Sequence, residues 1–288
     1  MNLIMNRVKT ILLMVALTAI LLLIGGLIAG EDGVVVAFII ALAVNFFSYW
    51  FSDKVAIAMT HSKPLNENQA PQVYKAMREL VNEANMPMPK LYIMPTDQPN
   101  AFAAGRNPNN AVIAVTRGLI DILEYDELKG VLAHELAHIR NRDILISTLA
   151  AVIAGALMFI TRIGTYGMLY GGGRRRSRDS GGIISLFFRL FAIILAPLAA
   201  LIIRMAISRT REYGADATGA QLARNSEGLA SALEKMESYA RQRPLQINEA
   251  TSHMFIVNPL SAKGLSNLFS THPPLEERVK RLRSQQVY

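Results

Sequence analysis

The chain has 288 residues, of which 51% are hydrophobic and 18% are charged, whereas an average soluble domain carries roughly 25% charged residues. This composition argues against a purely soluble globule and excludes a long disordered chain. Cysteine is absent, which excludes disulfides, thiolate metal sites and a cysteine nucleophile, and the net charge of +8 fits either nucleic acid or an anionic membrane surface.

Two apolar segments begin the chain and predict a hairpin of spanning helices within residues 1–52, at about 10–29 and 34–51. Each is close to the roughly 20 residues that a spanning helix needs, and the acidic stretch 31–33 is expected to form the turn. A cleaved signal peptide is the alternative, but the first segment lacks a small-x-small cleavage site followed by a soluble chain. Basic residues at both ends of the hairpin place those ends in the cytoplasm. They are Arg7, Lys9, Lys54 and Lys63.

Residues 53–143 are polar and are expected to form the first part of a cytoplasmic domain. Pro71 suits the first turn of a helix whose apolar stripe includes Val73 and Leu80. Three short β-like runs follow, separated by proline and asparagine turn signals, and they predict a small β-meander. The runs are 90–94, 100–104 and 111–116.

Residues 144–203 predict a second hydrophobic hairpin, with segments at about 144–161 and 183–203. Arg189 lies inside the second segment, near one end, where its side chain can reach the interface. If both segments span the membrane, the basic loop 171–178 faces outward, against the positive-inside tendency. Two full spans and a shallow re-entrant hairpin are therefore both left open.

The motif H-E-x-x-H occupies residues 134–138, within a helix predicted over 126–141. His134 and His138 are one helical turn apart on the same face, so their imidazoles can share one Zn²⁺ at about 2.0–2.1 Å. Glu135 is rotated by about 100° from His134 and can instead take the proton of a metal-bound water. Coincidence, or two solvated surface histidines, is the alternative, and the helical context favours the zinc site.

A catalytic zinc needs a third protein ligand and one open position. Residues 204–288 form the second part of the cytoplasmic domain and offer Glu212 and Asp216, again one helical turn apart. Glu212 could bind the metal while Asp216 accepts a hydrogen bond from the far nitrogen of a zinc-bound histidine and fixes its ring. An ordinary surface carboxylate pair is the alternative, and the presence of the H-E-x-x-H motif favours the metal site.

The remaining histidines are weaker candidates. His61 and His253 have no motif around them, and we interpret them as non-ligands. His272 precedes two prolines and is either a donor to the oxyanion of the tetrahedral intermediate or a turn histidine. A basic C-terminal helix predicts a solvated face near anionic lipid, and the lack of interleaved aromatic residues argues against nucleic-acid binding. Its basic residues are Arg278, Lys280, Arg281 and Arg283.

Four stretches of the chain together resemble the membrane zinc endopeptidases of the HtpX type, relatives of the CaaX prenyl protease of the endoplasmic reticulum. They are His-Glu-Leu-Ala-His at 134–138, Glu-Tyr-Gly-Ala-Asp at 212–216, Asn-Ala-Phe at 100–102 and Thr-His-Pro at 271–273. The resemblance covers essentially the whole chain. It includes the order of the parts: first hairpin, H-E-x-x-H motif, second hairpin, and the stretch with Glu212 and Asp216. It implies a mainly α, polytopic membrane protein with two transmembrane hairpins and a gluzincin-like cytoplasmic catalytic domain that carries the small β-meander.

The resemblance also implies roles for single residues. One Zn²⁺ per chain would be bound by His134, His138 and Glu212, with Glu135 as the general base. Asp216 would orient a histidine, and His272 is the candidate catalytic donor to the oxyanion. An edge strand beside the site would take up the substrate backbone as an added strand. That strand consists of Asn100, Ala101, Phe102 and Ala103.

The function implied is a zinc-dependent endopeptidase of the bacterial inner (plasma) membrane, multi-pass, with its active site in the cytoplasm. Its substrates would be misfolded or damaged membrane proteins and unfolded polypeptides, in membrane-protein quality control and the stress response. Its further partners would be the lipid bilayer and other membrane quality-control proteases, and not nucleic acid.

Two rival classes follow from the same residues. An intramembrane protease of the site-2 type is disfavoured because charged residues bracket the H-E-x-x-H motif, and such charges are costly at mid-bilayer depth. The motif helix instead runs into the segment 144–161, so we expect the zinc just above the bilayer surface. A non-enzymatic membrane scaffold would need a structural zinc closed by four protein ligands, with His272 or Asp216 in fourth place.

Overall fold

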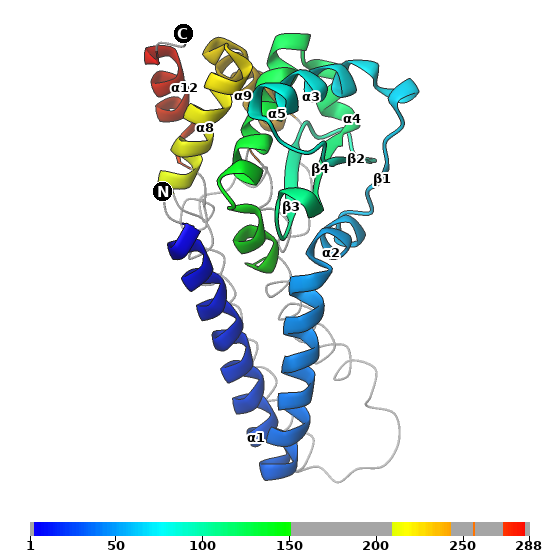
Figure 1. Cartoon of the computed structure of the whole chain (residues 1–288), viewed down its shortest axis with the longest axis vertical. Helices are drawn as coiled ribbons and strands as arrows, with labels where there is room; N and C mark the ends of the chain where they lie inside the picture. The colour runs from blue at the N-terminus through cyan, green and yellow to red at the C-terminus, as the bar shows by residue number, and fades with distance from the viewer. Residues whose placement is uncertain (1–2, 151–208, 243–255, 257–272, 286–288) are drawn as a thin grey trace.

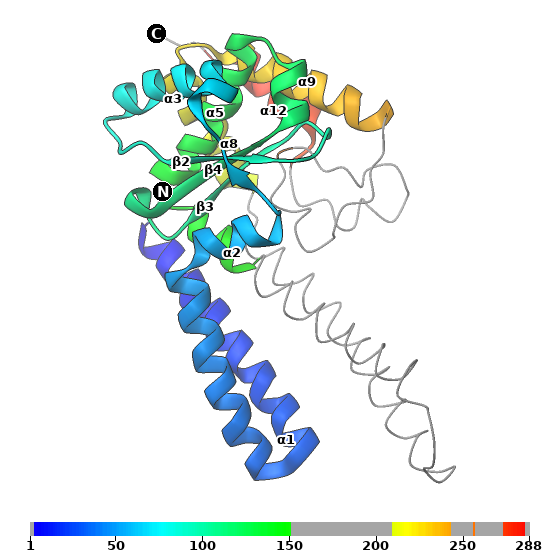
Figure 2. The same cartoon turned by 90° about the vertical axis from the view of Figure 1, so that its right-hand side faces the viewer.

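A hairpin of two long helices projects from one side of a mixed helical and β-sheet unit (Figures 1 and 2). A computed structural model describes residues 3–150, 209–242, 256 and 273–285. Residues 144–150 are helical, and the rest of the expected second hairpin, including the loop 171–178, lies outside the described residues.

The hairpin is formed by α1 (Leu3–Trp50), whose two halves meet at a break in helical geometry at Ala29 and Gly30. The candidate spans are Val8–Leu27 and Ala29–Trp50, and only 17% and 22% of their most apolar windows are buried within the protein. These helices are therefore not core helices of a soluble fold. The expectation of two apolar N-terminal helices is confirmed.

The turn of the hairpin lies earlier than the sequence predicted. Gly30 has φ +59° and ψ −138°, a conformation that glycine adopts without a Cβ clash. Glu31 and Asp32, expected in the turn, instead begin the second helix, where negative charge favours the positive end of the helix dipole. The two helices then approach closely, because a Cβ on Gly25 would lie 2.2 Å from the carbonyl oxygen of Gly33.

The sheet contains four strands in the order β1-β2-β4-β3, and it is mixed rather than a meander. β3 and β4 form the expected antiparallel hairpin, but β2 pairs with β4 in parallel. The meander prediction was wrong because β2 does not pair with β3, the next strand in the chain, but runs parallel to β4. Turn residues mark where strands end, and they do not determine which strands pair. The strands are β1 (Lys63–Pro64), β2 (Lys90–Met94), β3 (Ala101–Gly105) and β4 (Ala111–Thr116).

The two faces of the sheet are covered by different helices, as the alternation of side chains along a strand requires. Ala56 of α2 (Ser52–Met59) packs with Phe102 and Val112 on the face toward the hairpin. Ala103 and Ile113 belong to the main core on the other face. That core includes side chains of the helices α3 (Pro71–Ala84), α5 (Tyr125–Arg140), α8 (Arg209–Ala223) and α9 (Ser226–Gln242).

Helix α5 is the centre of the helical layer, and it packs against α3, α8, α9 and β3. Two glycines allow this close approach. A Cβ on Gly130 would lie 2.6 Å from the backbone nitrogen of Leu229, and one on Gly219 would lie 2.9 Å from that of His134. The remaining described elements are η1 (Glu67–Gln69), η2 (Pro108–Asn110), α4 (Arg117–Ile122) and α12 (Leu275–Ser284).

Candidate metal centre

Helix α5 carries both histidines of the H-E-x-x-H motif on one buried side. The helix begins with a reciprocal cap, in which the side chain of Glu127 accepts a 2.9 Å hydrogen bond from the backbone N–H of Glu124. The expected helix over 126–141 is thus confirmed. His134 is 1% exposed, while the His138 side chain is 16% exposed. The ring centroids of the two histidines lie 4.7 Å apart and the rings are nearly perpendicular.

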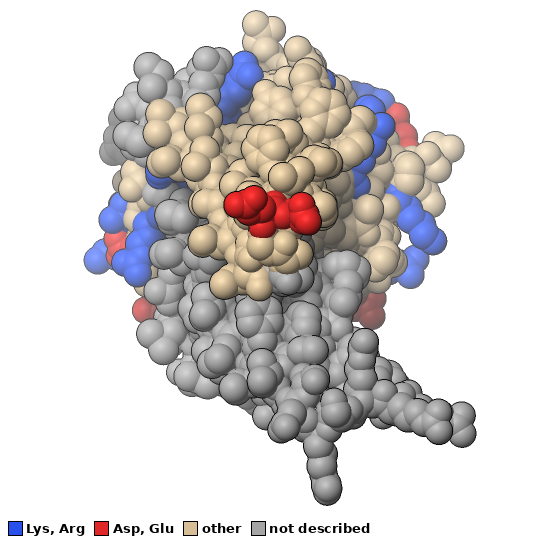
Figure 3. Space-filling model, turned by 90° about the horizontal axis from the view of Figure 1, so that it is seen from below, with Lys and Arg blue, Asp and Glu red and all other residues tan. Residues whose placement is uncertain are grey.

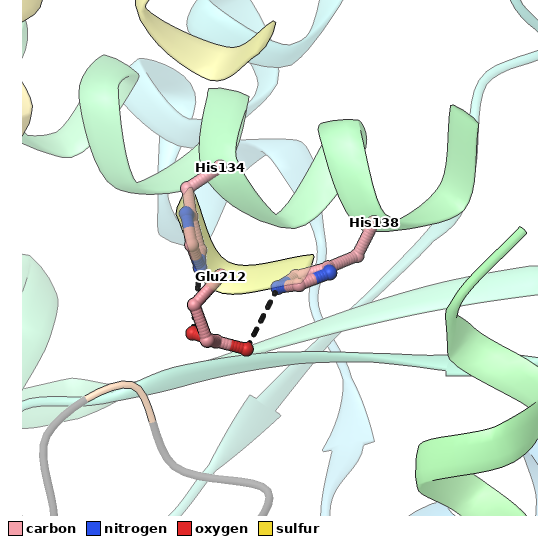
Figure 4. A group of neighbouring side chains, drawn as sticks. All are labelled: His134, His138 and Glu212. Carbon is pink, nitrogen blue, oxygen red and sulfur yellow. Dashed lines mark ion pairs between the residues drawn. The ribbon is translucent and has the colours of Figure 1, made fainter. Parts of the chain in front are cut away.

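Helix α8 brings Glu212 to the two histidines from 74 or more residues away in the chain, with Gly219 allowing the helix to lie directly on α5. The Nε2 atom of His134 is 3.8 Å from Glu212 Oε2, and that of His138 is 3.6 Å from Glu212 Oε1. Figure 4 shows the carboxylate facing both rings. One ligand atom from each of the three side chains lies within 4.8 Å of the others.

The donor set fits a Zn²⁺ ion. Ligand atoms at about 2.0–2.1 Å from a tetrahedral zinc are roughly 3.3 Å from one another, close to the 3.6 Å and 3.8 Å that separate Glu212 from the two Nε2 atoms. Both imidazoles turn Nε2 toward the carboxylate, since each Nδ1 faces a different acid. Two neutral imidazoles and one carboxylate form a ligand set found in catalytic zinc sites.

Asp216 fixes the ring of His134 and is itself held by an arginine. Its Oδ1 atom is 2.9 Å from His134 Nδ1. Arg278 of α12 donates two hydrogen bonds to this carboxylate, from Nε at 2.9 Å and from Nη2 at 2.7 Å. Burial works against ionisation of Asp216, but the charge and hydrogen bonds of Arg278 hold its pKa well below the usual range. The carboxylate therefore stays charged beside the histidine.

Arg278 is the residue that the sequence interpretation missed. The expectation of a solvated basic face was wrong for this residue, since Arg278 is 1% exposed. The sequence does contain a signal for this burial, because Arg278 lies at helical spacing from Leu275, Val279 and Leu282 and so shares their apolar face. Helix α12 lies on the far side of the domain from the hairpin (Figure 1).

The same arginine connects the metal centre to β3. Its Nη1 donates to the carbonyl oxygen of Ile256 at 3.3 Å, and the N–H of Ile256 donates to Asn100 Oδ1 at 3.0 Å. Asn100 Oδ1 also accepts from the N–H of Ala101 at 2.8 Å. Asn100 is 1% exposed, so it acts in the described structure as a buried tie between β3 and the chain before α12.

His138 is paired with Asp143, another residue whose role the sequence did not predict. Its Nδ1 atom is 3.4 Å from Asp143 Oδ2. Burial opposes protonation of His138, but the carboxylates of Asp143, Glu212 and Glu135 raise its pKa to about 9. Three carboxylates around one ring favour a bound cation at this position.

Glu135 lies between α5 and the sheet. It is 3% exposed, and burial raises the pKa of its carboxyl group, against the effect of the adjacent histidines. The backbone N–H of Ala103 hydrogen-bonds to it, so β3 contacts the residue directly. Alternate residues of a strand point their N–H groups to opposite sides. The backbone N–H groups of Ala101, Ala103 and Gly105 therefore point away from β4.

The structure brings five of the expected site residues together: His134, Glu135, His138, Glu212 and Asp216. It also places Asn100, Ala101, Phe102 and Ala103 at or in β3, the terminal strand of the described sheet. His61 lies elsewhere, in the link between α2 and β1, and lines a separate pocket. His253 and His272 lie outside the described residues.

Comparison with known proteins agrees with this geometry. Residues 67–286 match the model of peptidase family M48. A protease HtpX homolog from Syntrophobacter fumaroxidans is 54% identical over 97% of this chain and 99% of its own length. One from Thermococcus sibiricus is 50% identical over 96% of this chain and 94% of its own length.

One solved structure shows a similar fold. The crystal structure of S. mikatae Ste24p aligns over 97% of this chain with a TM-score of 0.52 and 19% sequence identity. The chain spans 66% of the length of that structure. At this level of identity, the similarity supports a shared fold and nothing further.

Proposed function

The chain belongs to peptidase family M48 and is a membrane zinc metalloprotease, and from this premise we propose that it is an endopeptidase acting in membrane-protein quality control and the stress response. Its substrates are misfolded or damaged membrane proteins and unfolded polypeptides. The observation that carries the proposal is the convergence of two imidazole Nε2 atoms on the Glu212 carboxylate, beside the buried Glu135 and against β3.

We propose that His134, His138 and Glu212 hold one Zn²⁺ per chain. A zinc ion held by these residues would supply Lewis-acid chemistry, lowering the pKa of a bound water toward about 7 and polarising the scissile carbonyl. Asp216 and Asp143 keep the two rings oriented and direct each Nε2 toward the ion. Because Arg278 and His134 already engage Asp216, this carboxylate is not free to close the site as a fourth ligand, which weakens the structural-zinc alternative.

Glu135 acts as the general base. Burial raises the pKa of its carboxyl group, which makes Glu135 a stronger proton acceptor than an exposed glutamate. It accepts the proton of the attacking water and returns it to the leaving amine. His272 would supply a hydrogen bond to the oxyanion, a role that remains a proposal because this residue lies outside the described part of the chain.

Substrate recognition uses the backbone of β3. An extended substrate would add to the outer edge of β3 as a further strand. The N–H groups of Ala101 and Ala103 on this edge already donate to Asn100 and Glu135, so the backbone carbonyl groups of this edge would accept hydrogen bonds from the substrate. Backbone pairing of this kind tolerates many sequences, which suits an enzyme that acts on unfolded chains. The small side chains of this strand also leave room for a neighbouring backbone.

We further propose a multi-pass protein of the bacterial inner membrane with a cytoplasmic catalytic domain, which shares substrates with other membrane quality-control proteases. Viewed from the hairpin end, acidic side chains gather at the near tip, while basic side chains, with a few acidic ones among them, lie around the rim of the domain behind it (Figure 3). Glu31 and Asp32 begin the second helix of the hairpin. This distribution supports a domain on the side that positive charges prefer.

The test is cleavage of an unfolded protein by the full chain in detergent, with and without a chelator. We expect chelator-sensitive cleavage by the natural sequence and none by Glu135→Gln, which should still bind zinc stoichiometrically. Near-normal cleavage by Glu135→Gln would contradict the proposed mechanism. If the natural sequence binds zinc but cleaves nothing, a non-enzymatic scaffold would be favoured. Membrane proteins cross-linked to Glu135→Gln in cells would identify the substrates.

A further inference from the structure

A pocket of about 580 Å³ lies on the opposite face of the sheet from the metal centre. Helix α2 forms one wall, and the sheet forms the other through Tyr92 of β2 and Val112 of β4. The link between α2 and β1 closes one end. The volume falls within the range of about 300–1,000 Å³ that is usual for ligand sites, yet the protease chemistry makes no use of this pocket.

The lining of the pocket has an apolar floor and cationic edges. Val112 is buried in the small core beneath α2, while Lys54 and Lys63 contribute two ammonium groups. Neither lysine forms an ion pair with a carboxylate among the described residues. Tyr92 adds a phenol hydroxyl, and Asp53 is the one acidic residue among those lining the pocket.

The pocket also lies at the junction between the membrane hairpin and the domain. Lys54 follows the end of the second candidate span, at Trp50, by about one helical turn, or roughly 5 Å. The headgroup layer of a bilayer extends roughly 5–8 Å beyond the hydrocarbon core. An aromatic cluster marks this depth, as interfacial aromatic belts do. It consists of Phe46, Phe47, Trp50 and Phe51.

We propose that this pocket binds the headgroup of an anionic phospholipid. Lys54 and Lys63 pair with the phosphate oxygens, the Tyr92 hydroxyl donates a hydrogen bond, and the apolar floor receives the glycerol backbone. Charge complementarity and continuity with the membrane hairpin favour a lipid over a soluble ligand. The bound lipid would attach the sheet to the membrane surface and thereby hold the metal centre, on the other face, at a fixed orientation to the bilayer.

The experiment measures lipid binding to the full chain in detergent, after delipidation, by native mass spectrometry. Phosphatidylglycerol and phosphatidylcholine with identical acyl chains are titrated separately. Since each lysine near a membrane surface contributes about a fivefold preference for anionic lipid, and the two preferences multiply, we expect the first phosphatidylglycerol to bind about 25-fold more tightly. The double variant Lys54→Gln/Lys63→Gln should bring this preference close to one.

Two further variants separate the pocket from general surface attraction. Ala58→Trp fills the pocket from α2 without changing the charge, and it should also abolish the preference. The double variant Lys75→Gln/Arg78→Gln removes two charges from α3, away from the hairpin (Figure 1), and should leave the preference intact. The midpoint of thermal unfolding checks each variant, and Ala58→Leu replaces Ala58→Trp if the larger residue lowers that midpoint.

Three outcomes would overturn the proposal. The lysine double variant could keep the preference for phosphatidylglycerol, which would show that Lys54 and Lys63 do not bind the headgroup. The filled variants could keep it while the lysine variant loses it, which indicates attraction to the surface and not to the pocket. Inorganic phosphate could displace the lipid at equal concentration, which would make free phosphate the ligand. None of these readouts depends on proteolysis.

Discussion

The Oδ1 atom of Asp216 lies 2.9 Å from Nδ1 of His134, and the same carboxylate receives two hydrogen bonds from Arg278. These three residues come from α8, α5 and α12, and all three are buried. The orientation of the His134 ring, a proposed zinc ligand, therefore depends on an arginine near the end of the described chain. The catalytic centre and the packing of the last helix are one structural unit.

Replacement of Arg278 by glutamine should destabilise the whole domain. The buried Asp216 would lose its charged partner, and breaking a buried ion pair in this way costs about 3–5 kcal/mol. We expect a lower midpoint of thermal unfolding and weaker zinc retention, both measured on the full chain in detergent. Arg281→Gln is the control, because Arg281 is exposed. Unchanged unfolding and zinc content in Arg278→Gln would contradict this reading of the contact.

Glu212→Ala should lose the metal and the activity together. Two histidines alone leave a zinc site with too few protein ligands, so we expect less than stoichiometric zinc by elemental analysis. Glu237→Ala, in which the lost carboxylate pairs with Arg241 on the surface of α9, should retain full zinc. Full zinc occupancy in Glu212→Ala would show that a different residue is the third ligand.

Gly219→Ala should move Glu212 of α8 away from the two histidines of α5. The added Cβ would lie 2.9 Å from the backbone nitrogen of His134, which is closer than packed atoms tolerate, so α8 must move away from α5 and carry Glu212 with it. We expect weaker zinc affinity, measured by competition with a chelator. Gly214→Ala is the matched control on the same helix, because no atom of another described element lies within 4 Å of its added Cβ. Equal zinc affinity in the two variants would refute the packing argument.

Glu127 should make stability depend on pH. Its carboxylate accepts hydrogen bonds from Ser231 at 2.5 Å and from Lys235 at 2.8 Å. Burial opposes ionisation, but these hydrogen bonds lower its pKa below the usual range. Since the folded pKa is the lower one, the stabilisation is fully present above the unfolded pKa of about 4.3 and is lost as pH falls through the folded pKa.

The corresponding variant is Glu127→Gln. At pH 7 it should lower the free energy of unfolding by about 1.5–3 kcal/mol, the usual range for hydrogen bonds to a charged group. The difference from the natural sequence should shrink as the pH falls well below 4.3, when unfolding midpoints are compared at each pH. Glu276→Gln, at an exposed side chain of α12, should show little change at either pH. A difference that is independent of pH would rule out the proposed charge effect.

Much of the local structure followed from periodicity and composition. The two apolar segments, the helix from Pro71 and the helix with the H-E-x-x-H motif all depend on contacts between residues close in the chain. The β3–β4 hairpin followed in the same way from its turn residues. The order of the strands did not, because the parallel pairing of β2 with β4 requires a long-range choice that no local signal encodes.

The sequence by itself was enough to identify the apolar N-terminal hairpin and the residues of the candidate zinc site. These residues are the two histidines and the glutamate of the H-E-x-x-H motif and the acidic pair Glu212 and Asp216. The tertiary structure alone decided which distant groups surround them. It buried Arg278 against Asp216, set Asp143 beside His138 and turned Ala103 of β3 toward Glu135. The reason is physical, because spacing along a helix fixes which residues share a face, whereas the partner of that face is chosen by packing and by the need to satisfy buried charges.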